Sequence, residues 1–381
     1  MRIVHICISA PYIDGWGYQE NLLPEYLNSL GVENYVIASS SNFPTYLKQE
    51  DILKIQSKGC KYQYNDITVY RLNTYSLSSN FIVTCRLSKV LEEIKPDIIL
   101  HHNINPTSLL IASRYSRKNG CTLLVDNHAD EINMNKNKVW VAFYHKILVR
   151  LSCKCCDSAI TKYLGVTHSR CDFIRKYYKI PEEKIELLPI GADTKFANTI
   201  DNKDILRAKY GFSANDFIVV SGGKMGLYKG TDILIKSVKI LCEENLKMKL
   251  ILFGTYEDSS TKELAESNSF ITQFGWCDRK KTLELLKLAD VACWPVHHTT
   301  LIEDAISVNT PIVLRKTRTT EHLIAENGAW IDYPSMEKLS QILRVFVECP
   351  ESDKKMVRDS AISLKRTLSY DSIAKRILEF R

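Results

Sequence analysis

Residues 222–230, GGKMGLYKG, have the types and spacing to bind a phosphate-rich ligand. Two glycines close an apolar run, and Lys224 and Lys229 follow before a segment with helical periodicity. Ammonium groups beside a helix N-terminus suit a diphosphate, because cations and free backbone amides both favour negative charge. Each contact could contribute about 4 kcal/mol at 4 Å and an effective dielectric of 20. The spacing is not that of a P-loop, and two solvated surface lysines are the alternative interpretation.

A second polar loop, within residues 292–314 (ACWPVHHTTLIEDAISVNTPIVL), admits more than one chemistry. The adjacent His297 and His298 invite a metal, but neighbouring histidines on a loop rarely ligate together, and no HxxxH pair accompanies them. Thr299 and Thr300 could offer hydroxyls and amides to a phosphate at a helix start. Glu303, one turn further on, could accept hydrogen bonds from ribose hydroxyls. The residue types therefore favour a nucleotide over a metal.

Two loops in the first half of the chain could also contact a ligand. In SAPYIDGWGYQEN, Gly15 and Gly17 would let the backbone approach a ligand ahead of a helix, although the pattern is not GxGxxG and an ordinary turn is the alternative. In LLVDNHADE, Asp126 and His128 stand with two further carboxylates at the end of an apolar run. His128 could bind a sugar hydroxyl or transfer a proton, or it could simply be satisfied by nearby backbone.

Short apolar runs of strand length alternate with helical patterns along almost the whole chain. In the first half we expect strands at RIVHICIS, NYVIASS, ITVYRLN, DIILHH, TLLVDNH and SAITK. Helices are expected at about 18–30 with Gly31 as stop signal, in an amphipathic run ending at Lys95, near 107–118, and in the stretch before SAITK. A second series comprises FIVVSGG, KLILFGT, SFITQFGW, DVACWPV, TPIVLRK and AWIDY. This alternation predicts an α/β fold with mostly parallel sheets.

The 381 residues suggest two domains. Their join is expected within residues 185–196 (IELLPIGADTKF), where an apolar run ends at a Pro and a Gly. We therefore place an N-terminal domain at 1–190, a C-terminal domain at 191–365, and a C-terminal helix at 366–381 that packs back on the N-terminal domain. Two facing doubly wound domains would place ligands at the C-terminal ends of their strands, in the cleft.

Composition limits the function classes. A net charge of +7 is too small to argue for nucleic acid, which we do not expect as a partner. Between residues 136 and 184, however, the sequence has eleven Lys or Arg and only four Asp or Glu. This region is expected either to touch an anionic membrane surface or to be a solvated face. No apolar run approaches the roughly 18 residues of a membrane span.

The twelve cysteines fit reduced thiols in a cytoplasmic protein. The opening run MRIVHICISA is short for a signal peptide and reads better as a buried strand. Cys153, Cys155 and Cys156, with Cys171 further on, raise a zinc hypothesis that their spacing does not support, because no CxxC pair is present. We expect a cytoplasmic location, with peripheral contact on the inner face of the membrane.

Taken in order, these segments resemble the retaining glycosyltransferases of family 4, which have the GT-B fold of two facing Rossmann-like domains. The resemblance spans nearly the whole chain and rests on KPDIILHHN, LLVDNH, LLPIGADTKF, GGKMGLYKGTDILIKSV, LILFGT, FGWCDRKKTLELLKLADV and EDAISVNTPIVL. Each motif is weak alone, and the set is specific for the fold and superfamily.

The resemblance implies roles for individual residues. His128, Lys224 and Lys229 would be catalytic, with Lys224 standing where the family usually has Arg. Donor-binding residues would be Gly15, Trp16, Gly17, Gly223, Gly254, Gly275, His297, His298, Thr299, Thr300, Leu301 and Glu303. Acceptor contacts are expected from Tyr12, Asp14, Tyr18 and Asp126. No metal or other cofactor is expected.

One departure from the family pattern concerns the sugar-binding carboxylate. The family usually has a Glu eight positions before the second Glu, and counting back from Glu303 reaches Pro295. The loop looks about four residues shorter than usual, so His297 or His298 is expected to reach the space of the first Glu.

The implied activity is transfer of a hexosyl or N-acetylhexosaminyl group, with retention, from a nucleotide-sugar donor to a glycan or lipid-linked acceptor. UDP is the expected donor nucleotide, and cell-surface polysaccharide synthesis is the expected context. Two alternatives stay open. One is a degenerate subunit that binds without turnover, and the other is a nucleotide-sugar epimerase of the same fold.

Overall fold

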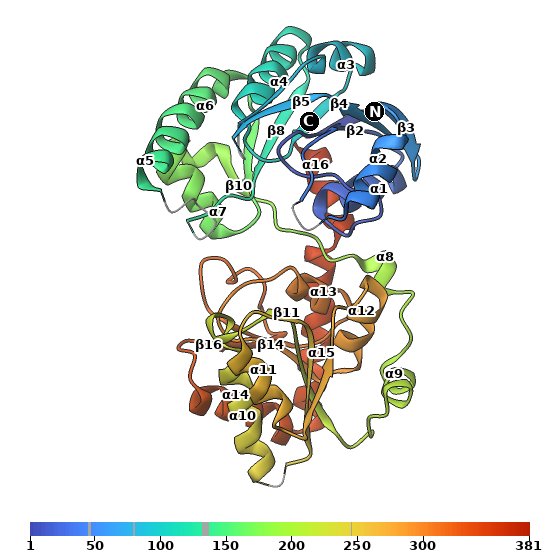
Figure 1. Ribbon diagram of the computed structural model, residues 1–381, viewed down its shortest axis with the longest axis vertical. Coiled ribbons are helices and arrows are strands. Elements are labelled where there is room, and N and C mark those ends of the chain that lie inside the picture. The colour runs from blue at the N-terminus through green and yellow to red at the C-terminus, as the bar shows by residue number, and fades with distance from the viewer. Residues whose placement is uncertain (45–46, 79–80, 132–136, 245) are drawn as a thin grey trace. The chain divides into compact units, whose positions relative to one another are not determined.

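The computed structural model describes residues 1–44, 47–78, 81–131, 137–244 and 246–381, which form two compact units (Figure 1). Unit 1 contains Met1–Pro189 and Tyr370–Arg381, and unit 2 contains Ile190–Ser369. The sequence places the boundaries after residues 190 and 365, one and four residues from where the structure divides the chain. Helix α16 (Tyr370–Glu379) lies against α1 (Gln19–Ser29) within unit 1, where Figure 1 shows it in red among blue elements.

Unit 1 is built on one large sheet with strand order β10-β9-β8-β7-β1-β2-β4-β3. Its pairings are parallel except for that of β3 with β4. The central strands are buried almost end to end, as expected when helices cover both faces of a parallel sheet. The strands are β1 (Arg2–Cys7), β2 (Glu33–Ser39), β3 (Lys61–Tyr64), β4 (Ile67–Leu72), β7 (Ile98–His101), β8 (Thr122–Asn127), β9 (Lys162–Gly165) and β10 (Ile185–Leu187).

The helices of unit 1 follow the expected alternation. Besides α1 and α16 they are α2 (Gln49–Ser57), α3 (Leu87–Ile94), α4 (Pro106–Asn119), α5 (Lys138–Val141), the π-helical η1 (Ala142–Val149), α6 (Arg150–Cys156), α7 (His168–Phe173) and the π-helical η3 (Ile174–Tyr178). Short 3₁₀ turns occur at η2 (Asp157–Ala159) and η4 (Glu182–Lys184). Because η2 includes Ser158 and Ala159, the first two residues of SAITK, the strand expected there begins only at Lys162.

The amphipathic run ending at Lys95 is only partly helical. Its first part forms an antiparallel hairpin of β5 (Thr74–Ser78) and β6 (Phe81–Thr84), and the helix is confined to α3. Alternate residues of β6 are buried, including Ile82 and Thr84, which is the period of a strand. Arg86, at the start of α3, has a φ of 72°, so the backbone turns there and cannot continue a helix from upstream.

Unit 2 has a fully parallel sheet with strand order β13-β12-β11-β14-β15-β16. Its strands are β11 (Phe217–Met225), β12 (Met248–Tyr256), β13 (Ile271–Phe274), β14 (Val291–Trp294), β15 (Ile312–Arg315) and β16 (Gly328–Ile331). Its helices are α8 (Thr194–Ala197), α9 (Lys203–Tyr210), the 3₁₀ turn η5 (Leu227–Lys229), α10 (Thr231–Glu243), α11 (Ser259–Glu266), α12 (Arg279–Leu288), α13 (Leu301–Ser307), α14 (Met336–Glu348) and α15 (Glu351–Leu368). The chain proceeds from β11 to one side and returns to the other at β14, so the strand order reverses between these two strands.

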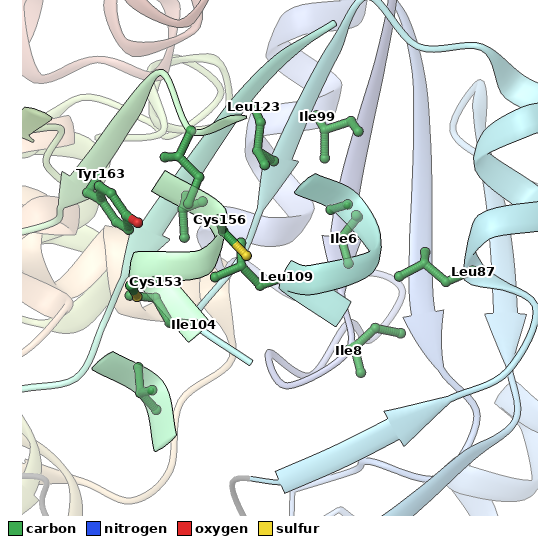
Figure 2. Close-up of a cluster of buried hydrophobic side chains, with 14 of the residues drawn as sticks. Ile6, Ile8, Leu87, Ile99, Ile104, Leu109, Leu123, Cys153, Cys156 and Tyr163 are labelled. Carbon is green, nitrogen blue, oxygen red and sulfur yellow. The ribbon is translucent and has the colours of Figure 1, made fainter. Parts of the chain in front are cut away.

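The cysteines that raised the zinc hypothesis mostly belong to the core of unit 1. Figure 2 shows Cys153 and Cys156 among apolar side chains, with Cys156 beside Leu109 of α4. Burial raises the pKa of the Cys153 thiol to about 12, which disfavours a thiolate ligand. Cys155 is exposed, and in the described ranges no group of three or more His, Cys, Asp or Glu could hold a metal ion.

None of the helices described is both long and apolar enough to cross a lipid bilayer.

Candidate functional site

A pocket of about 150 Å³ opens in unit 2 at the C-terminal ends of β11 and β14. These two strands are adjacent, and the strand order reverses between them, which is where open parallel sheets bind ligands. The pocket is lined by Ser221, Gly222, Lys224, Met225, Lys229, Thr231, Trp294, Pro295, His297, His298 and Thr299. The two loops singled out from the sequence thus meet at one site.

Backbone geometry shapes the loop between β11 and α10. Gly223 has a φ of 101°, a conformation that favours glycine, and a Cβ there would come within 3.3 Å of Leu301. The amide of Gly226 donates to Thr231 Oγ1 at 3.1 Å, and the amide of Leu227 donates to Asp258 Oδ2 at 2.9 Å. These bonds fix the loop so that its lysines lie ahead of α10.

The two lysines of this loop differ in environment. The side chain of Lys224 is 71% exposed, and its Nζ lies 3.5 Å from Glu257 Oε1. Lys229 is half-buried, and burial lowers its pKa; Lys224 lowers it further, while Glu257 opposes the change. Two cations that face one pocket with one nearby carboxylate make the pocket suited to an anion.

The second loop brings His298 and Glu303 together. His298 Nε2 lies 3.0 Å from Glu303 Oε1, and the Glu303 side chain is only 4% exposed. Burial alone would raise the pKa of Glu303, but His298, its largest opposing influence, brings the pKa below its ordinary value. Glu303 therefore stands behind His298 rather than in the pocket lining, and His298 is the side chain that a pocket ligand would meet.

His297 lines the pocket and lies beside Tyr228 of η5. Its ring lies 6.0 Å from that of Tyr228, and its pKa is lowered by burial and then by the charges of Lys229 and Arg315. A neutral imidazole in this position can both donate and accept hydrogen bonds, as a hydroxyl-rich ligand requires.

The remaining residues of unit 2 predicted to bind the donor lie at the same sheet edge. Gly254 lies two residues before the end of β12, and its amide donates to the carbonyl of Gly275 at 3.0 Å. A Cβ on Gly254 would come within 2.1 Å of the Gly223 carbonyl oxygen, so the close approach of β11 and β12 depends on this glycine. Thr300 and Leu301 form the start of α13, next to the pocket residue Thr299.

The loop after β1 in unit 1 carries a second set of predicted residues. Asp14 pairs with Lys58 at 2.7 Å and accepts a hydrogen bond from Tyr62. Gly15 has a φ of 81°, and Trp16 stacks edge-on with Tyr18 at 5.3 Å. Gly17 and Tyr18 are exposed and Trp16 is partly so, which leaves them open to a ligand. Asp14 is instead engaged by the chain itself.

A chain of buried polar side chains leads to His128, and of its members only Asp126 and His128 were named from the sequence. His5 Nδ1 lies 3.1 Å from His102 Nε2, and His102 Nδ1 lies 2.6 Å from Asp126 Oδ2. Asp126 Oδ1 then lies 3.5 Å from Nε2 of His128, whose side chain is 23% exposed. The other ring nitrogen of His5 meets Asn34 Oδ1 at 3.2 Å.

The charges along this chain can be assigned. Burial alone would raise the pKa of Asp126, but His102 and His128 outweigh it and hold the pKa below its ordinary range. Burial likewise opposes the charge on His102, yet Asp126 raises its pKa. Burial and the nearby His102 lower the pKa of His5 to about 3. His5 is therefore neutral, and His102 and Asp126 form the ionised pair.

The acceptor contacts predicted for Tyr12 and Asp126 require correction. Tyr12 is 1% exposed and packs in the core near Arg71, while Asp126 is fully buried. Neither side chain presents surface to an acceptor, because both are committed to interactions inside unit 1. Asp126 is instead held by His102 and by the amide of Asn103, and its Oδ1 lies 3.5 Å from His128 Nε2.

Comparisons with known proteins agree with this architecture. Residues 22–196 match the family described as Glycosyltransferase Family 4, and residues 202–361 match Glycosyl transferases group 1. Together the two matches span most of the chain and support a family 4-like glycosyltransferase of the GT-B fold. A curated relative, putative glycosyltransferase EpsD of Bacillus subtilis (strain 168), is 27% identical over 227 residues, and the chain spans 56% of that relative's length and 56% of its own.

Solved structures share the fold at low identity. A glycosyltransferase from Rickettsia africae ESF-5 matches with a TM-score of 0.71 and 16% identity over 99% of this chain and 97% of the other. Anabaena Alr3699/HepE, solved with UDP, matches with a TM-score of 0.68 and 14% identity over 100% and 99%. The same Anabaena protein was also solved with UDP-glucose.

Within this family 4-like glycosyltransferase, sequence reasoning found the loops but not their whole environment. Met225, Thr231 and Trp294 line the pocket, although their types and positions look like ordinary strand and helix residues. Trp294 Nε1 donates to the Gly222 carbonyl at 3.2 Å and so ties the two strands together. The alternating series of strands was the signal that could have found these pocket residues, because residues at the C-terminal ends of neighbouring parallel strands lie at the same edge of the sheet.

Proposed function

We propose that this chain is a retaining glycosyltransferase that moves a hexosyl or N-acetylhexosaminyl group from a UDP-sugar to a glycan or lipid-linked acceptor in cell-surface polysaccharide synthesis. The observation that carries the proposal is the pocket at the β11–β14 reversal, where Lys224, Lys229 and the N-terminus of α10 converge. The Anabaena complexes with UDP and UDP-glucose support the choice of nucleotide.

In the proposed reaction, the bond between the anomeric carbon of the sugar and the diphosphate oxygen breaks. A bond from the acceptor hydroxyl oxygen forms on the same face, and the hydroxyl proton passes to the departing diphosphate oxygen. This step needs no protein nucleophile. Lys224, Lys229 and the first amides of α10 would stabilise the charge that grows on the diphosphate, and we propose that no metal is required.

The assignment of the diphosphate is tested by a double variant, Lys224→Ala with Lys229→Ala. We expect its affinity for UDP, measured by titration calorimetry in EDTA, to fall at least about 10-fold, because two cations leave one pocket. The matched control is Lys236→Ala with Lys239→Ala, which removes two exposed lysines from α10 outside the pocket lining. Equal affinity of the two double variants for UDP would refute the assignment.

The second candidate function is that of a catalytically degenerate binding subunit, and a specific observation favours it. Pro295 lines the pocket where the family pattern has a Glu, and Glu303 is buried behind His298. Hydrolysis or transfer of UDP-sugars by the purified chain would exclude this alternative. UDP binding without turnover across a panel of sugars and acceptors would support it. The predicted contact of His128 with the transferred sugar stays part of the first proposal.

A further inference from the structure

The helical run from α5 through η1 to α6 carries an exposed apolar stripe. Val139 is 79% exposed, Phe143 and Ile147 are each 52% exposed, and Leu151 is 55% exposed. The four residues are spaced four apart on one continuous helical run, so they lie close to one line along its surface. We call these four residues the apolar stripe. Exposed apolar side chains at regular spacing indicate a surface that is covered in use.

The π-helical segment helps to keep the stripe straight. In an α-helix, residues four apart drift around the axis, because one turn takes only 3.6 residues. The wider turn of η1 (Ala142–Val149), with its i→i+5 bonding, offsets that drift between Phe143 and Ile147. The opposite face is firmly packed, with Tyr144, Val149 and Cys153 in the core of unit 1. The run therefore has one face in the protein and one face outside.

A row of cations flanks the stripe. Lys146, Arg150 and Lys154 are exposed and are themselves spaced four apart along the same helical run. No Asp or Glu occurs between residues 132 and 156. Within the described ranges these three make no ion pair. The other cations of the basic region differ, since most of them are paired: Lys162 with Glu186, Arg170 with Asp130, Arg175 with Asp172 and Lys184 with Asp157. The uncompensated positive charge thus concentrates beside the apolar stripe.

We infer that this face binds the surface of an anionic membrane, with the apolar stripe inserted among the acyl chains and the cation row on the lipid headgroups. An amphipathic helix with this division of residues lies in the plane of the interface. Trp140, which is partly exposed and stacks on Tyr144 at 5.6 Å, has the residue type that favours the headgroup region. A second copy of the chain fits less well, because it would bring an identical cation row against the first.

This inference does not depend on the proposed transfer reaction. The face belongs to unit 1, whereas the pocket with Lys224 and Lys229 belongs to unit 2. Failure of vesicle binding would leave the UDP measurements untouched, and loss of UDP binding would leave vesicle binding untouched.

The test is flotation of the full chain with vesicles of phosphatidylcholine alone or mixed with phosphatidylglycerol. We expect recovery with the anionic vesicles, weak recovery with neutral vesicles, and loss at high salt. Two variants probe the two components: Phe143→Ser with Ile147→Ser and Leu151→Ser, and Lys146→Glu with Arg150→Glu and Lys154→Glu. Each should reduce the partition coefficient at least about 10-fold. Their UDP affinity and circular dichroism should stay unchanged, which separates lost binding from lost folding.

A matched control replaces two exposed apolar residues of unit 2, Val345→Ser and Met356→Ser, and should bind vesicles normally. Normal vesicle binding by both test variants would overturn the inference. So would a wild-type chain that ignores anionic vesicles but forms dimers by light scattering that the stripe variant lacks, because that result assigns the face to a second copy. Wild-type binding to a polyanionic protein with no binding to vesicles would overturn it in favour of an acidic partner.

Discussion

At the scale of single residues, burial decides which predicted side chains can act on a ligand. Glu303 has the chemistry to bind a ribose, but it lies behind His298, whose imidazole faces the pocket. Asp126 likewise has a carboxylate that could bind a hydroxyl of the acceptor substrate, yet it is fully buried between His102 and His128. In both cases the buried carboxylate lies within hydrogen-bond distance of a histidine, His298 for Glu303 and His102 for Asp126. The histidine is then the residue through which the carboxylate affects function.

The ionised pair of His102 and Asp126 can be tested directly. Asp126→Asn removes the negative charge that raises the pKa of His102, so burial should then bring that pKa below 6.5. The titration of the His102 ring, followed by NMR, should move to lower pH, and the free energy of unfolding should fall by about 3 kcal/mol. His128→Gln serves as a control, because it leaves Asp126 in place. A His102 titration that is the same in wild type and Asp126→Asn would contradict the assignment.

At the scale of elements, the sequence predicted the strands of unit 2 and most of those of unit 1, because continuous apolar runs mark buried parallel strands. It missed β3 (Lys61–Tyr64), an edge strand whose side chains are exposed or half-buried, and the hairpin of β5 and β6. It also missed the contact of His5 with His102. That contact depends on the register of β1 against β7, in which Ile6 pairs with His101, and a single sequence does not contain this register.

The pocket loops could be predicted because their position follows from topology alone. Lys224 and His298 are more than seventy residues apart, but each follows a strand in a parallel series, and those strands prove to be neighbours. The depth of each side chain could not be predicted, because it depends on how the loop closes over α13. Lys224, Lys229 and His297 line the pocket, whereas Glu303 is buried beside His298, and their ligand contacts stay predictions.

The close approach of β11 and β12 predicts the effect of one added methyl group. Gly254→Ala would place a Cβ about where the Gly223 carbonyl stands, at a φ of 116° that disfavours any side chain. We expect the free energy of unfolding, from urea titration, to fall by about 3 kcal/mol, with weaker UDP binding because Gly223 must shift. Gly275→Ala is the matched control, since nothing lies within 4 Å of its added Cβ. Similar stability of the two variants would show that the strands can separate without cost.

At the scale of the whole molecule, the two units should respond differently to acid. Unit 1 buries three histidines whose pKa values burial lowers, to about 3 for His5 and about 4 for His101 and His145. For His101 burial is the largest cause, and it outweighs the opposing effect of the hydrogen bond to the Asn103 carbonyl. Unit 2 has His297, whose pKa is lowered, and Asp304, whose pKa burial raises to about 6.

The direction of each effect follows from which state binds more protons. Between pH 6.5 and 4 the unfolded chain protonates the three histidines of unit 1 while the folded unit does not, so unit 1 loses stability as the pH falls. His102, with its raised pKa, opposes this loss. Asp304 has the reverse sign: its neutral form suits the folded state, so its contribution to stability is lost as the pH rises through about 6. In unit 2 the effects of Asp304 and His297 therefore oppose each other.

We accordingly expect two calorimetric transitions that move by different amounts when the pH is lowered from 7.5 to 5. Over this range, each histidine with a lowered pKa reduces the free energy of unfolding of unit 1 by about 2 kcal/mol, and His102 offsets part of the total. The transition temperature of unit 1 should therefore fall by about 10 °C. The transition of unit 2 should move much less. We expect UDP to raise the transition temperature of unit 2, where we propose that it binds, and so to identify the transition of that unit. His101→Gln should make the transition of unit 1 less sensitive to pH, and an unaltered pH dependence in this variant would mean that burial does not hold His101 neutral.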